Sequence, residues 1–244
     1  MENKTKRLVL LAMLTAMAFV VGLYRIRFMG AATFLEYDAK DVIIVIGGFM
    51  FGPLAALMMS FVLALIEMLT HSEAGLWGML MNFIASAALA CPAAIIYHRF
   101  RSIRGAVVGL LVGIVAATSS MLLWNYLVVP FYTGWPREAV VGMLVPVFLP
   151  FNLIKATLNS ALVMVLYKPI TKALKSAKLY NPTHASSSAG KLNVAILLAA
   201  AFVVISLALF IFIRRIPNPT QEYYENQEYT LRRTACILWN LDNN

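Results

Sequence analysis

Long apolar runs are the feature that most constrains the fold of this 244-residue chain. The runs cover residues 8–24, 42–70, 76–97, 105–128, 142–167 and 192–213. A helix needs about 20 apolar residues to cross the hydrocarbon core of a bilayer. Only 13% of the residues are charged, against about 25% in soluble domains. The sequence therefore predicts an all-α membrane protein that crosses the bilayer several times.

The run at 42–70 divides into two helices. Gly52 and Pro53 interrupt it, because proline ends a helix and glycine permits the turn. We expect a short second helix at 41–51 and a third at 53–70. The second would rise only about 17 Å, at ~1.5 Å per residue, which is too little to cross alone. Residues 1–180 are thus predicted to form a six-helix bundle.

The net charge of +9 is placed in particular loops. Basic residues precede the first helix and fill the loops after the fourth and sixth helices, whereas "THSEAGLW" has none. These residues are Lys4, Lys6, Arg7, Arg99, Arg101, Arg104, Lys168, Lys172, Lys175, Lys178 and Lys191. The alternation follows the positive-inside rule and predicts a cytoplasmic N-terminus. It favours contact with anionic lipid and argues against a nucleic-acid partner.

The C-terminal part departs from a six-helix pattern. We expect a polar linker at 181–191, an additional hydrophobic helix at 192–213 and a polar tail at 214–244. The charges conflict here. A seventh helix should leave toward the outside, yet Arg214 and Arg215 follow it at once. The sequence therefore leaves the role and topology of 181–244 open.

Motifs for enzymatic activity are missing from the sequence. It contains neither a G-x-x-x-x-G-K-[ST] phosphate loop nor an H-E-x-x-H zinc motif. The three histidines lie far apart at loop-like positions, and no catalytic or metal site is predicted. Among the acidic residues only Glu67 falls within an apolar run. One carboxylate does not supply the acid and base of a two-carboxylate mechanism.

Polar residues inside the sixth helix are the candidate binding site. Asn152, Lys155 and Asn159 are spaced i, i+3 and i+7, which places them on one helix face. Asn125 lies in the fifth helix. If the fifth and sixth helices adjoin, Asn125 lies at a depth similar to that of Asn152 and Lys155. Together they would suit a ligand rich in carbonyls and ring nitrogens. The alternative is interhelical hydrogen bonding, favoured for Asn159, or an ion pair between Lys155 and Glu67.

Four segments carry a family resemblance. They are "FLEYDAKDVIIVIGGFMFGPLAAL", "GLWGMLMNFIASA" at 75–87, "WNYLVVPFY" at 124–132 and "LPFNLIKATLN" at 149–159. Over roughly residues 5–175 the chain resembles the S components of energy-coupling-factor vitamin transporters, most closely the riboflavin-specific type. The resemblance implies a six-helix bundle in the bacterial plasma membrane that captures riboflavin from outside. It also implies a membrane coupling subunit and two ATPase subunits as partners, with riboflavin as cargo and no cofactor.

The resemblance assigns roles to individual residues. Asn125, Asn152 and Lys155 fall where the riboflavin type hydrogen-bonds the flavin ring. Tyr37 and Asp38 lie in the first outer loop, which helps to cap the site.

Ala12 and Ala16 fall on the alanine motif that docks the coupling subunit. Their small-xxx-small spacing also lets helices approach closely. Asn82 matches a motif position without an assigned contact. Two alternatives stay open: the same architecture with another vitamin or metabolite, and a membrane scaffold whose polar residues only join helices.

Overall fold

The computed structural model describes residues 4–26, 35–70 and 74–176. These residues form seven α-helices and one π-helical segment. They are α1 (Lys4–Gly22), α2 (Lys40–Phe51), α3 (Pro53–Thr70), α4 (Gly75–Phe100), α5 (Ile103–Thr133), α6 (Arg137–Met143), η1 (Leu144–Phe148) and α7 (Leu149–Ser176). The linker, additional helix and tail predicted at 181–244 lie outside the described residues.

Five segments of the described chain are long and apolar enough to cross a membrane. They are Lys4–Gly22, Pro53–Thr70, Gly75–Phe100, Ile103–Phe131 and Arg137–Ala173. The twelve-residue α2 is not among them, as the sequence predicted. Gly52 joins α2 to α3 with a positive φ of 100°, a conformation that favours glycine. The helical membrane fold is therefore confirmed for the described part of the chain.

The segment 128–140, between two of the apolar runs, is largely helical. α5 continues to Thr133 through Pro130, and only 134–136 separate it from α6. Gly134, with φ of 72°, ends α5 in the left-handed region. The helix predicted at 142–167 lies within one longer span, Arg137–Ala173, in which η1 separates α6 from α7. Proline lacks the N–H of a regular helix, and Pro146 lies within η1, where a π-helical turn accommodates that loss.

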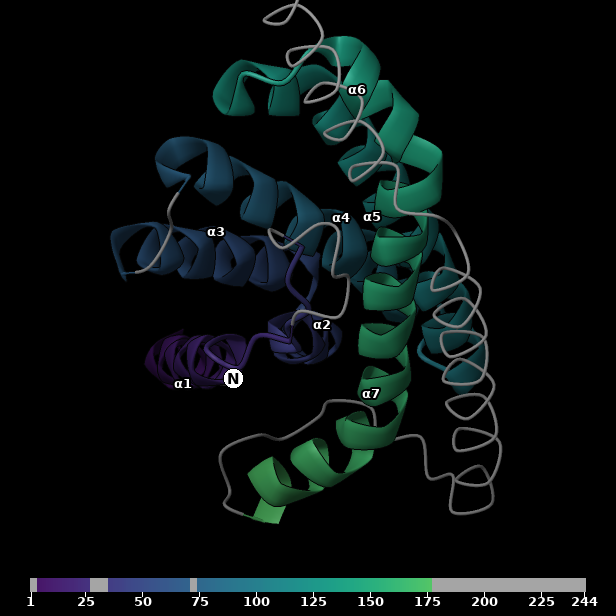
Figure 1. Ribbon diagram of the computed structural model, residues 1–244. Coiled ribbons are helices and arrows are strands. Elements are labelled where there is room, and N and C mark those ends of the chain that lie inside the picture. The colour runs from purple at the N-terminus through teal and green to yellow at the C-terminus, as the bar shows by residue number, and fades with distance from the viewer. Residues whose placement is uncertain (1–3, 27–34, 71–73, 177–244) are drawn as a thin grey trace, which may run out of the picture.

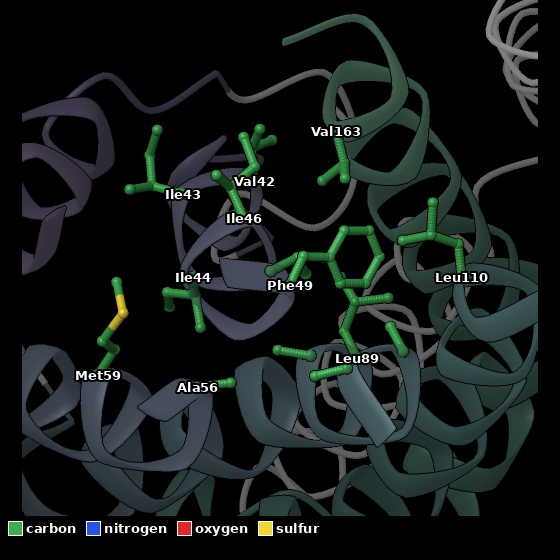
Figure 2. Close-up of a cluster of buried hydrophobic side chains, with 14 of the residues drawn as sticks. Val42, Ile43, Ile44, Ile46, Phe49, Ala56, Met59, Leu89, Leu110 and Val163 are labelled. Atoms are coloured by element: carbon green, nitrogen blue, oxygen red, sulfur yellow. The ribbon is translucent and has the colours of Figure 1, made fainter. Parts of the chain in front are cut away.

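α2 is the centre of the bundle. All twelve of its residues are buried, and it packs against α1, α3, α4 and α7 (Figure 1). Ile44 points toward Ala56 and Met59 of α3, and Phe49 points toward Leu89 of α4 (Figure 2). A helix that is apolar on every face is typical of a buried core element. Residues 35–39, the described end of the predicted outer loop, lead into α2 and are therefore held in place by the core; the name outer loop is kept for these residues.

Glycines let α4 and α5 approach closely. A Cβ atom added at Gly113 would lie 2.5 Å from the carbonyl oxygen of Leu89, and one at Gly109 would lie 2.7 Å from that of Ala93. The two glycines are four residues apart and share one face of α5, which brings the helix backbones together. This contact orients α5 in the bundle, and α7 packs on another side of α5.

Candidate functional site

A cluster of buried and partly buried polar side chains lies where α1 and α3 end and where α2 and α4 begin. We call it the polar cluster. Its members are Tyr37, Asp38, Lys40, Asp41, Glu67, Asn82, Ser86, Lys155 and Asn159. They come from the outer loop, α2, α3, α4 and α7, so five segments distant in sequence meet here. Charged groups inside a membrane bundle are expensive and mark functional sites.

Lys155 of α7 forms an ion pair with the outer loop. Its Nζ donates to Oδ2 of Asp38 at 2.8 Å, with both side chains largely buried. Lys155 therefore has an acidic partner, which comes from the segment before α2. Glu67, the partner considered from the sequence, is engaged elsewhere. The loop carboxylate reaches the lysine because α2 anchors the loop directly beside α7.

A second buried ion pair joins α2 to α3. Lys40 Nζ donates to both carboxylate oxygens of Glu67, at 2.8 and 2.7 Å. Asn82 of α4 donates to Glu67 at 2.9 Å. Lys40 also lies 3.9 Å from Asp38, and this links the two pairs. Asn82, a motif position without a predicted contact, thus holds the Glu67 carboxylate of α3.

Asn159 connects α7 to the outer loop and α2. Its Oδ1 accepts from the Tyr37 hydroxyl at 3.0 Å, and its Nδ2 donates to the Asp38 carbonyl at 3.3 Å and to Asp41 at 3.4 Å. Ser86 of α4 donates to the other oxygen of Asp41. The interpretation of Asn159 as a residue that joins segments of the bundle is confirmed.

The electrostatics of the outer loop follow from burial and from these charges. Burial, reinforced by the Asp38 carboxylate, raises the pKa of Tyr37 to about 12. Burial acts to raise the pKa of Asp38 as well, but the ammonium groups of Lys155 and Lys40 outweigh it and hold that pKa below its ordinary value. At neutral pH the loop therefore presents a neutral phenol and an ionised carboxylate.

Asn125 and Asn152 lie on α5 and α7, which pack against each other. Asn125 Nδ2 donates to the Met121 carbonyl at 2.7 Å, and Asn152 Nδ2 donates to the Phe148 carbonyl at 2.8 Å. Each bond is made within the residue's own helix and leaves the amide oxygen as an acceptor. Among the hydrogen bonds of the described residues, Lys155 and Tyr37 belong to the polar cluster, whereas those of the two asparagines stay within their own helices.

Ala12 and Ala16 lie on the exposed face of α1. The opposite face is buried, with Leu10, Leu14 and Ala18 in the core. The two alanines are thus accessible to another helix. No contact within the described chain covers this small-residue face.

Sequence reasoning missed Lys40, Asp41 and Ser86 as members of the polar cluster. A signal was present in "EYDAKD", which places four charged residues directly before a fully apolar run. Asn82 and Ser86 offered a second signal, because two polar residues four apart share a face of an otherwise apolar helix.

Fold and site together define a class: a helical, multi-pass membrane protein with a charged polar cluster inside its bundle, near one end. A family described as "ECF transporter, substrate-specific component" matches residues 6–167. The match spans well over half of the chain, and the chain belongs to this family of S components. The family is part of a transporter, so the prediction of a transport subunit and not an enzyme is confirmed.

Individual relatives agree with the family. The riboflavin transporter FmnP of Bacillus subtilis (strain 168) is 32% identical over 189 residues, which cover 72% of this chain and 100% of the relative. The riboflavin transporter RibU of Staphylococcus aureus (strain TCH60) is 29% identical, with 71% and 94% covered. A solved structure of the S component of a bacterial ECF transporter superposes with a TM-score of 0.62 at 29% identity. That match covers 71% of this chain and 99% of the other.

Proposed function

We propose that this S component captures riboflavin, or a close flavin, from outside the cell for ATP-driven uptake by partner subunits. Two relatives named as riboflavin transporters support the substrate, at 32% and 29% identity over most of their lengths. The observation that carries the proposal is the Lys155–Asp38 ion pair. Because Asp38 balances the charge of the ammonium group, the site calls for a polar but neutral ligand, as riboflavin is.

The donors and acceptors near α5 and α7 suit a flavin ring. The Lys155 ammonium has three hydrogens, of which Asp38 takes one, so the others remain for ligand carbonyls. Asn125 and Asn152 offer amide oxygens as further hydrogen-bond acceptors for the ligand. A vitamin that carries a carboxylate would compete with Asp38 for Lys155 and meet repulsion from Asp38. Neutral flavins avoid this cost.

The family supports the partners: a membrane coupling subunit and two ATPase subunits. The exposed face of α1 with Ala12 and Ala16 is the proposed docking surface for the coupling subunit. The proposed orientation has a cytoplasmic N-terminus. Basic residues at the start of α1 and between α4 and α5 support it, and the polar cluster lies toward the opposite ends of these helices.

The test is purification from cells that contain flavin, followed by identification of any bound compound from its absorbance and mass. We expect riboflavin with the unmodified chain and with Lys168→Met, a matched change further along α7. We expect loss of flavin with Lys155→Met. A different vitamin in the purified protein would contradict the proposal that riboflavin is the substrate. A well-folded protein that never retains a ligand would favour the alternative of a membrane scaffold.

A further inference from the structure

One acceptor in the polar cluster has no donor. Oδ2 of Asp38 receives the hydrogen bond from Lys155, but its Oδ1 is buried and has no partner among the described residues. The residue as a whole is 7% exposed. A buried polar atom without a hydrogen bond is costly, more so on a charged group. Such an atom in a binding protein calls for a donor from outside the chain.

The other carboxylates of the cluster do not share this property. Glu67 accepts from Lys40 at both oxygens and from Asn82. Asp41 accepts from Ser86 at one oxygen and from Asn159 at the other. Asp38 is thus the one carboxylate of the polar cluster with an unmet oxygen. The remaining buried atoms of this kind in the described residues belong to uncharged side chains: Thr118, Trp124 and Ser160.

The charge of the cluster restricts the missing donor. Its carboxylates are Asp38, Asp41 and Glu67, and its ammonium groups are Lys40 and Lys155, so acids outnumber bases. An anionic group beside Asp38 would add repulsion inside a bundle of low polarity. A neutral N–H or O–H donor meets the need without adding charge.

We propose that the free oxygen of Asp38 accepts a hydrogen bond from an N–H of the ligand while Lys155 donates to the carbonyl beside it. This inference rests on the proposed flavin function and deepens it. Lys155 and Asp38 form a donor next to an acceptor, which complements a carbonyl next to an N–H. The pyrimidine edge of a flavin carries that pair at its N3–H. Asp38 is therefore a specificity-determining residue, because a ligand without the N–H leaves its oxygen buried and unpaired.

The experiment compares the affinities of riboflavin and N3-methylriboflavin. In the unmodified chain, methylation should weaken binding about tenfold or more, the usual effect of losing a hydrogen bond to a charged group. In Asp38→Asn the amide still accepts from Lys155 but faces the ligand with a donor. The penalty for methylation should then fall to within about threefold. Glu36→Gln is the matched control: the same chemical change in the same loop, on a side chain that pairs with Arg25. It should keep the full penalty.

The outcomes separate the two proposals. If riboflavin does not bind the unmodified chain, the proposed function fails. If riboflavin binds but methylation has no effect, or the same effect in Asp38→Asn, only the role of Asp38 fails, because a persistent penalty reports the size of the methyl group. Lumiflavin and N3-methyllumiflavin repeat the comparison on the unmodified chain without the ribityl hydroxyls. A penalty that vanishes for this pair would overturn the assignment to the pyrimidine edge.

Discussion

The buried Lys40–Glu67 pair offers a test of how the polar cluster is held together. The two side chains are 5% and 2% exposed, and their closest atoms are 2.7 Å apart. We consider Lys40→Met, Glu67→Leu and the double variant. Each single change removes one charge and leaves the other buried without its main partner.

The magnitude follows from this geometry. At 2.7 Å and an effective dielectric constant of 20, Coulomb's law gives about 6 kcal/mol of attraction, much of which offsets the desolvation of both groups. Loss of one partner of a buried pair costs about 3–5 kcal/mol. The double variant places apolar side chains of similar volume together, and its loss should be at least about 2 kcal/mol smaller than the sum of the single losses.

The assay is reversible unfolding in mixed detergent micelles, followed by circular dichroism, for all four proteins. For a chain of this size about 1 kcal/mol corresponds to roughly 2–4 °C in a thermal scan, so the single variants should differ visibly from the parent. The more exposed Arg25–Glu36 pair is the internal control, and Glu36→Gln should cost less than about 1 kcal/mol. Additive losses in the double variant would refute the idea that the two charges stabilise each other.

Three further predictions address packing, docking and pH. Gly113→Ala should cost about 1–3 kcal/mol of unfolding free energy in the same assay, because its Cβ would lie 2.5 Å from the Leu89 carbonyl oxygen; an unchanged stability would contradict the close helix contact. Ala12→Leu with Ala16→Leu should abolish co-purification with the coupling subunit while leaving flavin binding intact, since both side chains are exposed on α1; retained co-purification would rule out this docking face. The pKa of Tyr37 is raised from 10.0 to about 12, so its contribution to stability is full below pH 10.0 and is lost toward pH 12. The stability difference between the parent and Tyr37→Phe should therefore narrow across that interval, and a constant difference would contradict the buried phenol.

Much of the fold could be predicted because its signals are local. The apolar runs locate the helices, and Gly52 with Pro53 marks the break between α2 and α3. The extension of α5 through Pro130 was missed, since proline and turn-forming residues predict a loop when neighbouring helices are unknown. The close contact of α4 and α5 depends on Gly109 and Gly113. The spacing of these glycines is visible in the sequence, but the helix that they contact is not.

Only part of the candidate site could be predicted, because the contacts that form it are long-range. Lys155 was recognised as unusual from its own helix, yet its partner Asp38 lies 117 residues away. That pairing depends on α2 packing between α3 and α7, which no local pattern reports. Charged residues at the edge of an apolar run usually predict a solvated loop, and here the bundle buries Asp38 and Lys40 instead.

The most direct test of the account is a calorimetric titration of ligand-stripped protein with riboflavin, with folding verified by circular dichroism. The account predicts one saturable site per chain, filled by the neutral vitamin beside Lys155 and Asp38. A folded protein that takes up no riboflavin at any concentration tested would contradict it.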